Sequence, residues 1–282
     1  MVARLGDLWE LGDHRLLCGD ATSAADVDRV MAGDRARLVA TDPPYLVNYT
    51  GERRAKGRSA GKDWSHLYRE ISGDQAGPFF RAVFDQVVRV LDDRGAVYCW
   101  HAHRRVGLLQ QIWTDVGLLD HQLLVWVKPT RVFGRCMYHH QHELCLFGWR
   151  KGSKPRHDGR GDLTSVWTVA GVDVEASPAS DVWCADWEGK RRVVGNEHPT
   201  QKPVELFARP MRKHTLAGEI CFEPFSGSGS QLVAAEQLGR RCRAIEIQPA
   251  FVDVAIRRWQ TVTGKPATLE GRTYDQVART RG

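Results

Sequence analysis

The sequence lacks several features that would place it in other classes of protein. No apolar run reaches the roughly 18 residues that a membrane-spanning helix needs. The first residues, Met1-Val2-Ala3-Arg4-Leu5, contain no apolar signal core, so we do not expect secretion. The seven cysteines are odd in number and form no Cys-x-x-Cys pair. This disfavours a disulfide framework or a structural zinc site and favours a reducing cytoplasm.

The apolar content is sufficient for a large core. The chain has 282 residues, of which 42% are hydrophobic and 26% charged, and we predict a single catalytic domain over 1–282. The net charge of +6 is compatible with nucleic acid, but it equally describes an ordinary solvated surface. Basic residues are most concentrated in 51–62, a glycine-rich segment with five Lys or Arg against Glu52 alone, which predicts a basic flexible loop.

Short apolar runs alternate with stretches of helical periodicity. Strands are predicted at Leu16–Cys18, Arg37–Ala40, Ala96–Trp100, Leu123–Val127, Leu144–Phe147, Glu219–Phe222 and Arg243–Ile247. Helices are predicted at Ala24–Ala32, Phe79–Leu91, Arg104–Val116, Val204–His214, Ser230–Leu238 and Pro249–Val262. This alternation predicts an α/β fold with a mainly parallel central sheet and helices on both faces.

The stretch 149–197 breaks this rhythm, because it is rich in Gly, Pro and Ser and has weak periodicity. We interpret it as an insertion in the catalytic domain. Its tryptophans, Trp149, Trp167, Trp183 and Trp187, either form a small core of their own or join Lys190-Arg191-Arg192 in a target-recognition region. The sequence favours neither interpretation.

The first chemical signal is Thr41-Asp42-Pro43-Pro44-Tyr45, directly after a predicted strand. A carboxylate at the carboxyl end of a strand lies where ligands of open α/β sheets bind. The two prolines remove N–H donors, so the local backbone offers only acceptors. A carboxylate and a carbonyl together suit a planar amino group, and Tyr45 offers a flat face for a ring. Taken alone, Asp-Pro-Pro favours an ordinary strand-to-loop turn with a surface tyrosine, and the aromatic and the next motif reverse this preference.

The second signal is the glycine turn Glu223-Pro224-Phe225-Ser226-Gly227-Ser228-Gly229-Ser230, between a predicted strand and a helix. Gln231 follows Ser230, so the lysine of a P-loop is missing, and Leu232 stands where a dinucleotide fingerprint has its third glycine. The next strand ends near Glu246, where a carboxylate accepts hydrogen bonds from a ribose. A cofactor with adenosine but no diphosphate, such as S-adenosyl-L-methionine, is favoured over NAD or ATP.

Four motifs in a fixed order resemble the beta group of amino-DNA-methyltransferases, over nearly the whole chain. They are Asp42–Tyr45, the Trp-Val-Lys-Pro at 126–129, the His-Pro-Thr-Gln-Lys-Pro at 198–203 and the Pro-Phe-Ser-Gly-Ser-Gly-Ser at 224–230. In that group the catalytic motif precedes the cofactor loop, in a circularly permuted version of the Rossmann-like methyltransferase fold. The resemblance implies methyl transfer from S-adenosyl-L-methionine to DNA, a restriction–modification setting and, in some relatives, a homodimer.

The resemblance also implies roles for residues. Asp42, Pro43, Pro44 and Tyr45 would hold and activate the target base. The cofactor would be bound by Asp20, His198, Thr200, Lys202, Glu223, Phe225, Ser226, Gly227, Gly229, Ser230 and Glu246. Among these, Asp20 would lie near the adenine, and His198, Thr200 and Lys202 near the methionine carboxylate. Glu223 and Ser230 depart from the family, which usually has Asp and often Thr there.

The implied chemistry is methylation of an exocyclic amine on a base that has left the duplex. No proline of this chain is followed by the Cys that methylation of cytosine C5 requires. Adenine N6 is favoured over cytosine N4, because Ser is the more frequent residue at the Asp42 position in the cytosine-N4 members. An RNA or protein-amide methyltransferase and an inactive DNA-binding relative are the alternatives.

Two further features have plain interpretations beside functional ones. His139-His140-Gln141-His142-Glu143 lacks the His-Glu-x-x-His spacing of a zinc site, so we predict no metal there and expect the polar start of a strand. The loop 51–62 is either a solvated insertion or a site of DNA-backbone contact, which its place after the catalytic motif favours. The predicted DNA contacts are Arg53, Arg54, Lys56, Arg58, Lys128, Lys190, Arg191 and Arg192.

Overall fold

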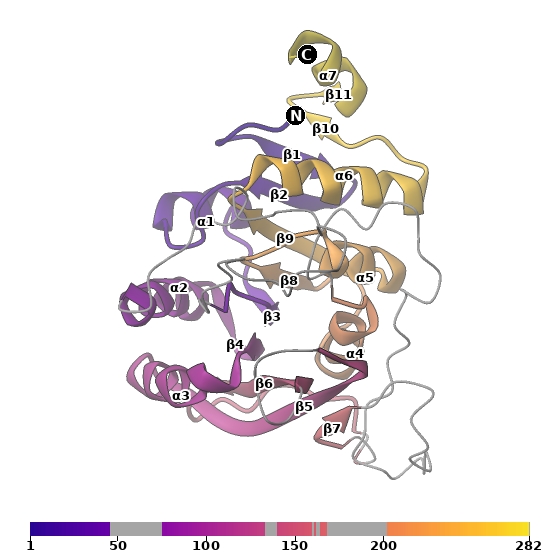
Figure 1. Cartoon of the computed structure of the whole chain (residues 1–282). Helices are drawn as coiled ribbons and strands as arrows, with labels where there is room; N and C mark the ends of the chain where they lie inside the picture. Colours follow the sequence, from indigo (N-terminus) through magenta and orange to yellow (C-terminus); the bar gives the residue numbers. More distant parts are fainter. Residues whose placement is uncertain (46–74, 133–139, 160, 162–163, 168–201, 282) are drawn as a thin grey trace, which may run out of the picture.

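The computed structural model describes residues 1–45, 75–132, 140–159, 161, 164–167 and 202–281. Within these residues the chain forms one mixed β-sheet with helices on both faces (Figure 1). The strands are β1 (Leu8–Leu11), β2 (His14–Cys18), β3 (Ala36–Thr41), β4 (Leu91–His101), β5 (Leu118–Val132), β6 (His140–Arg150), β7 (Val166–Trp167), β8 (Ile220–Glu223), β9 (Arg241–Glu246), β10 (Thr268–Leu269) and β11 (Arg272–Thr273). The helices are α1 (Ala24–Met31), α2 (Ala76–Val90), α3 (Val106–Asp115), α4 (Glu205–His214), α5 (Ser230–Leu238), α6 (Pro249–Thr263) and α7 (Tyr274–Arg281).

The centre of the sheet is parallel, as predicted. The strand order is β11-β10-β1-β2-β9-β8-β3-β4-β6-β5-β7, and the run from β2 to β4 pairs in parallel throughout. The chain leaves β8 for β9 on one side and β3 for β4 on the other, so the sheet order reverses between β8 and β3. Ligands of open α/β sheets bind outside the carboxyl ends of the strands at such a switch point.

The strand β6 runs against this direction. It pairs antiparallel with both β4 and β5. The start of β6 therefore lies at the same edge of the sheet as the carboxyl ends of β3, β4 and β8. Polar residues at the beginning of β6 are thereby brought to the edge where the parallel strands end.

Two hydrophobic cores lie on opposite faces of the sheet. One contains apolar residues of α1, α2 and α3, and the other those of α4, α5 and α6, consistent with the placement of these helices in Figure 1. The predicted helical spacing over Phe79–Leu91 is confirmed, because Phe80, Val83, Phe84 and Val87 are buried on one side of α2. Alternation along each strand then decides which core a side chain enters.

The two ends of the chain form an extension of the sheet that the sequence analysis did not predict. β1 pairs antiparallel with both β2 and β10, and β10 pairs with β11. The rings of Trp9 and Tyr274 pack with centroids 5.4 Å apart. These strands contain two to four residues, too few for a period-2 pattern to stand out.

The start of the expected insertion needs a correction. Trp149 and Arg150 complete β6, and Trp149 is a buried member of the sheet's core, because β6 is longer than its apolar centre indicated. Further on, Val166–Trp167 adds β7 beside β5. Residues 168–197 and the loop 51–62 lie outside the described residues. The target-recognition region in the insertion and the DNA contact by the loop therefore stay predictions. No helix among the described residues is long and apolar enough to cross a membrane.

Candidate active site

The predicted catalytic carboxylate lies where strand geometry places it. Asp42 follows β3 directly, and β3 pairs in parallel with β8, whose last residue is Glu223. Ala40 points into the core on the α4 face of the sheet, so Asp42, two residues later, follows on the same face. Asp42 thus lies beside the switch point, within the same edge as the glycine turn that follows β8.

Residues of β5 and β6 reach the same face of this edge. Cys145 and Trp126 belong to the core on the α4 face, so Glu143 and Lys128, each two residues away along its strand, also turn toward that face. Because β6 is antiparallel to β4, Glu143 stands at the start of its strand and not at the end. Asp42 and Glu143, which are 101 positions apart in number, thereby approach the same point.

Lys202 connects the two carboxylates. Its ammonium lies 2.7 Å from Asp42 Oδ2 and 2.9 Å from Glu143 Oε2. It also lies 3.2 Å from the Tyr45 hydroxyl, which in turn donates to Glu143 Oε2 at 2.7 Å. Lys128 pairs with the other oxygen of Glu143. The result is a cluster of two cations, two carboxylates and one hydroxyl at the edge of the sheet where the parallel strands end.

Burial and charge act against each other in this cluster. Burial raises the pKa of Asp42, and the Lys202 ammonium opposes that change. Burial would also raise the pKa of Glu143, but Lys202 and Lys128 lower it to about 2. The pKa of Tyr45 lies well above its ordinary value because of burial and the two carboxylates, so the phenol stays neutral. Asp42 Oδ1 is buried and has no hydrogen-bond partner among the described residues.

The glycine turn forms as predicted between β8 and α5. Gly227 and Gly229 have φ values of 50° and 78°, in the left-handed region that favours glycine. Gly229 is the N-cap of α5, so the first N–H groups of this helix face the turn. Phe225 packs against Phe79 of α2, with ring centroids 5.8 Å apart. The backbone of this turn can therefore approach a ligand closely.

Glu246, at the end of β9, supports the same turn. Its carboxylate accepts the N–H of Gly227 at 2.8 Å through Oε2 and the N–H of Gln248 at 2.8 Å through Oε1. Burial raises its pKa to about 7, although these N–H groups oppose the change. Asp20 lies close by, because the Gly19 N–H donates to the Glu246 carbonyl at 3.1 Å. Each carboxylate oxygen of Glu246 keeps a lone pair for a further donor.

Glu223, at a position where the resembled family usually has Asp, turns toward the end of β3. It is buried, and its Oε1 accepts from Thr41 Oγ1 at 2.8 Å and from the Phe225 N–H at 3.0 Å. Burial raises its pKa well above the ordinary value. The Glu223 carboxyl therefore connects the end of β8 with the end of β3. Ser230 is also buried, and its hydroxyl donates to the Lys202 carbonyl at 2.7 Å.

The structure brings together part of the predicted site. Asp42, Tyr45, Lys202, Glu223, Gly227, Gly229 and Glu246 meet at one edge of the sheet. Lys202 was predicted beside the cofactor's carboxylate; its ammonium contacts Asp42, and its role toward the cofactor stays a prediction. Lys128 was predicted on DNA; it pairs with Glu143, and its DNA contact stays a prediction. Outside the described residues lie His198, Thr200, Arg53, Arg54, Lys56, Arg58, Lys190, Arg191 and Arg192.

Sequence reasoning considered Glu143 only within the run His139–Glu143 and gave it no role in the site. Glu143 directly precedes the apolar run Leu144–Phe147. Its partner could not be known without the direction of β6. The described residues contain no group of three or more potential metal ligands.

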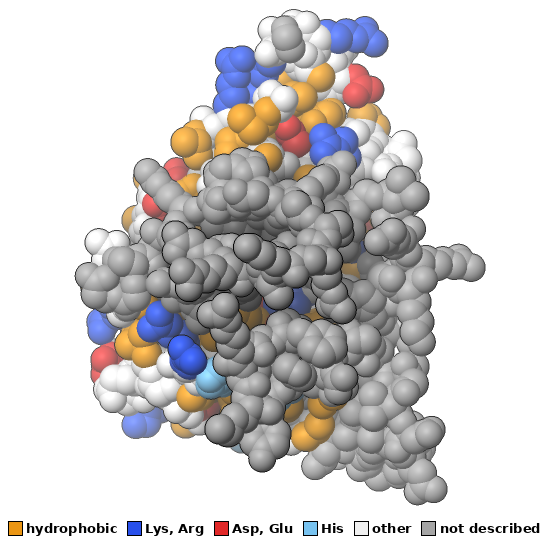
Figure 2. All heavy atoms as spheres, in the orientation of Figure 1, with side chains coloured by type: hydrophobic (Ala, Val, Ile, Leu, Met, Phe, Trp, Pro, Cys, Tyr) orange, Lys and Arg blue, Asp and Glu red, His pale blue; other side chains and the backbone are white. Residues whose placement is uncertain are grey.

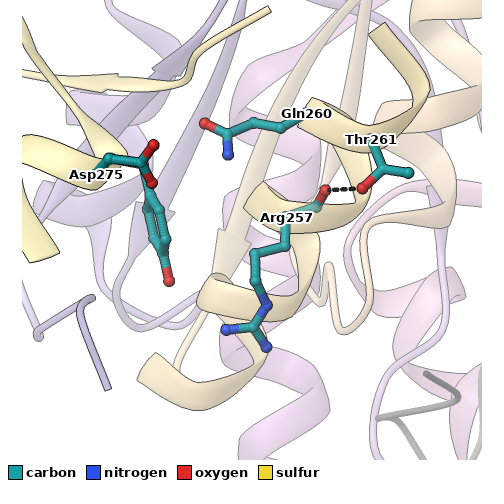
Figure 3. Close-up of a pocket in the computed structure, with 5 residues that line it drawn as sticks. Arg257, Gln260, Thr261 and Asp275 are labelled. Atoms are coloured by element: carbon teal, nitrogen blue, oxygen red, sulfur yellow. Dashed lines mark hydrogen bonds between the residues drawn. The ribbon is translucent and has the colours of Figure 1, made fainter. Parts of the chain in front are cut away.

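A shallow pocket of about 400 Å³ lies elsewhere, between the second half of α6 and α7 (Figure 3). It is lined by Arg257, Gln260, Thr261, Tyr274 and Asp275. Since α6 begins just after Glu246 and runs onward from the carboxyl edge, this pocket is separate from the site around Asp42.

Together, the fold and this edge define a Rossmann-like fold of the methyltransferase type, in which β3 and Asp42 precede the glycine turn in the chain. Residues 36–257 match the family model described as DNA methylase, of the N6/N4 type. The chain therefore belongs to the N6/N4 family of DNA methylases. Members of this family methylate amino groups of DNA bases, and the comparisons leave the choice between N6 and N4 open.

Curated relatives and solved structures support this membership. The chain is 24% identical over 223 residues to Type II methyltransferase M2.DpnII of Streptococcus pneumoniae, covering 78% of this chain and 81% of that protein. It is 24% identical over 230 residues to M2.MboI of Moraxella bovis, covering 80% and 81%.

Two solved structures share the fold. The M1.HpyAVI–SAM complex has a TM-score of 0.61 at 17% identity, covering 86% of this chain and 97% of that one. The PvuII DNA methyltransferase, described as cytosine-N4-specific, has a TM-score of 0.65 at 14% identity, covering 98% and 94%. At these identities the likeness shows the fold alone.

Proposed function

We propose that the chain transfers the methyl group of S-adenosyl-L-methionine to N6 of adenine in DNA, acting on a base turned out of the duplex. The observation that carries this proposal is Asp42 Oδ1, a buried carboxylate oxygen without a partner among the described residues. A buried acceptor of this kind is costly unless a ligand supplies the donor. Its place beside Pro43, Pro44 and the ring of Tyr45 suits an aromatic amine.

The amine of adenine is a poor nucleophile, because its lone pair is delocalised into the ring. Asp42 Oδ1 would accept one N–H of this amine and the Pro43 carbonyl the other, which localises the lone pair on nitrogen. The nitrogen would then attack the cofactor's methyl carbon in line, so that the N–C bond forms as the S–C bond breaks and S-adenosyl-L-homocysteine leaves. After transfer the nitrogen carries one proton too many, and Asp42 Oδ1 is placed to accept it. Fixed orientation and electrostatic positioning supply the acceleration.

The residues around the glycine turn fit the cofactor. Ser226 Oγ is buried and has no partner among the described residues, so a polar ligand atom can bind there. Gly227 and Gly229 would lie against the methionine portion, beside the ring of Phe225. Glu246 would accept the ribose hydroxyls, and Asp20 would lie near the adenine. When bound, S-adenosyl-L-methionine supplies an electrophilic methyl group on a sulfonium.

The target base and the DNA backbone have candidate contacts at the same edge. The Lys202 ammonium lies at the hydroxyl end of Tyr45, 3.2 Å from the hydroxyl and 5.2 Å from the ring centroid, and a base would stack on a face of this ring. A basic 3-10 turn, His103–Arg105, follows the carboxyl end of β4. Figure 2 shows basic side chains and a histidine on this face over α3. Phosphate contacts by these residues, by Lys128 and by the predicted basic loop would position the duplex.

The choice of base depends on Asp42. M2.DpnII and M2.MboI match over most of their length, and the PvuII enzyme, which shares the fold, is described as cytosine-N4-specific. Asp42 favours adenine, since Ser is the more frequent residue there in the cytosine-N4 members that the chain resembles. Cytosine N4 is therefore the second candidate, with the same acceptor chemistry.

The test compares acceptors and then identifies the product. Purified protein is incubated with tritiated cofactor and with duplex DNA, RNA or protein, and the methylated DNA is digested to nucleosides for mass spectrometry. We expect label in DNA as N6-methyldeoxyadenosine. Label in N4-methyldeoxycytidine would instead support cytosine N4, the second candidate, as the methylated position. Labelling of RNA or protein alone, or 5-methyldeoxycytidine, would contradict the proposal. Heat-denatured protein provides the background.

A further inference from the structure

The proposed reaction uses Asp42 and Tyr45 but gives no role to Glu143, although this side chain is only 14% exposed. A buried carboxylate is expensive unless cations and hydrogen bonds compensate it. Here both oxygens are engaged: Oε2 accepts from Lys202 and Tyr45, and Oε1 pairs with Lys128. Burying this ion cluster costs desolvation free energy, and the cluster lies beside the proposed reaction site. A role for Glu143 in the reaction would explain why it is there.

The two oxygens of Asp42 differ in their hydrogen-bond partners, because Lys202 contacts only one of them. An ammonium has three N–H donors, and the three acceptors within reach are Asp42 Oδ2 at 2.7 Å, Glu143 Oε2 at 2.9 Å and the Tyr45 hydroxyl at 3.2 Å. Asp42 Oδ2 is thereby occupied, while Oδ1 keeps no partner among the described residues. Lys202 thus fixes the Asp42 carboxylate through Oδ2 and leaves Oδ1 available to a ligand.

We infer that Glu143 is a positioning residue for this catalytic acceptor: it holds the Lys202 ammonium against Asp42 Oδ2, so that Oδ1 is directed to the target amine. This inference rests on the proposed role of Asp42. Glu143 touches neither the amine nor the methyl group in this arrangement and acts through Lys202. It also fixes Tyr45 by accepting its hydroxyl, so the acceptor and the stacking ring share one anchor.

Charge balance explains why a carboxylate stands at this position. Lys202 and Lys128 carry two positive charges, and Asp42 and Glu143 carry two negative ones. Without the charge of Glu143, the Lys202 ammonium would pair with Asp42 alone and would be drawn over the carboxylate toward Oδ1. The titratable groups that face Asp42 come from the strands β4, β6 and β8 and from the segments after β3 and before α4. They are Tyr45, Cys99, Glu143, Cys145, Lys202 and Glu223.

A purely structural salt bridge and a DNA-backbone site are the rivals, because Lys128 pairs with Glu143 and was predicted on DNA. Each of these two alternatives predicts a different set of changes in the variants than a positioning residue does. A structural pair alters the free energy of unfolding and leaves the turnover number kcat unchanged. A DNA-backbone site alters the KM for DNA and its salt dependence, again with kcat unchanged. A positioning residue alters kcat and the pH profile of kcat.

The experiment uses the full chain and the variants Glu143→Gln, Lys202→Met, the double variant and Lys202→Arg. We expect kcat to fall about tenfold or more in each of the first two, because a small displacement of a catalytic group is sufficient. The affinity for S-adenosyl-L-methionine, measured by calorimetry, should change by less than about threefold. The double variant should be no slower than Lys202→Met, since Glu143 acts on Asp42 through Lys202 and the amide oxygen that Glu143→Gln introduces can still accept the Tyr45 hydroxyl. Lys202→Arg should recover part of the loss.

The pH profile adds a readout that a structural role would not move. In Lys202→Met, Asp42 loses its cation, so the acidic limb of the kcat profile should move to higher pH. In Glu143→Gln the full charge of Lys202 acts on Asp42, so this limb should move to lower pH. The charge-removing control is Asp85→Asn, on the exposed ion pair between Arg81 and Asp85 of α2. It should leave kcat and its pH profile unchanged.

Three results would overturn the inference: an unchanged kcat in Glu143→Gln, losses that multiply in the double variant, or acidic limbs that move in neither variant. If Glu143→Gln fails to fold, Glu143→Asp keeps the charge and withdraws it by one methylene, and the same fall in kcat is required. Asp42→Ala is measured alongside. An inactive Asp42→Ala with an unimpaired Glu143→Gln rejects this inference alone, whereas an active Asp42→Ala rejects the proposed function itself.

Discussion

At the scale of single residues, the carboxyl groups of the site lie at the ends of parallel strands. Glu223 and Glu246 are the last residues of β8 and β9, Asp42 directly follows β3, and each carboxyl group has a distinct set of donors. Asp42 is held by Lys202, Glu223 by Thr41 and a backbone N–H, and Glu246 by two backbone N–H groups. In the proposed function, Asp42 would therefore act as the acceptor for the target amine and Glu246 as a cofactor acceptor, while Glu223 links the ends of two strands.

Glu246 predicts a pH dependence of cofactor binding. Burial raises its pKa to about 7, so the group is protonated in acid and ionised in mild base. A carboxylate accepts two ribose hydroxyls better than a carboxylic acid does, so binding favours the ionised form. The affinity for S-adenosyl-L-methionine should therefore rise about tenfold from about pH 6 to about pH 8, as the ionised fraction does.

Calorimetric titration over this pH range measures the effect. Glu246→Gln is the control, because it cannot ionise and keeps the size of the side chain. Its affinity should be lower at about pH 8 and nearly independent of pH. An equal pH dependence in both proteins would assign the titration to the ligand and remove Glu246 from the explanation.

At the scale of elements, the glycine turn depends on how closely α5 and α6 approach each other. A Cβ added at Gly229 would lie 3.0 Å from Ala255 Cβ on α6, and the φ of Gly229 is +78°. Any side chain there has both a strained backbone and a crowded neighbour. The turn therefore requires glycine for two independent reasons.

Gly229→Ala should consequently lower the free energy of unfolding by roughly 2 kcal/mol or more, from strain and crowding together. Gly218→Ala is the matched control, since Gly218 has a φ of +80° with nothing within 4 Å of an added Cβ. It should cost about 1 kcal/mol from the backbone alone. Urea unfolding measures both, and equal losses would contradict the close approach of the two helices.

The direction of β6 marks the limit of sequence-based prediction at this scale. The apolar run Leu144–Phe147 correctly indicated a strand, and the periodicity correctly indicated the helices from α1 to α6. Periodicity contains no information on whether a strand runs with or against its neighbours. Antiparallel pairing with both β4 and β5 is a long-range property, and it alone brings Glu143 to Asp42.

At the scale of the whole molecule, the parallel centre of the sheet could be predicted because its strands, buried on both faces, are continuous apolar runs. The terminal strands could not, because they are short and are held by partners distant in sequence, such as β1 with β10. The motifs gave Asp42 and the glycine turn, since each follows a strand directly. They did not give the contact between Lys202 and Asp42, which are 160 residues apart.

The central claim is that Asp42 holds the amine that receives the methyl group, and one measurement tests it most directly. The single-turnover rate of methyl transfer to duplex DNA is compared between the wild type and Asp42→Ala, with the affinity for S-adenosyl-L-methionine measured on the same samples. Removal of the acceptor should lower the rate by about a hundredfold or more, by analogy with the loss of one oriented group at a reacting centre, while the cofactor still binds. A rate near that of the wild type would contradict the claim.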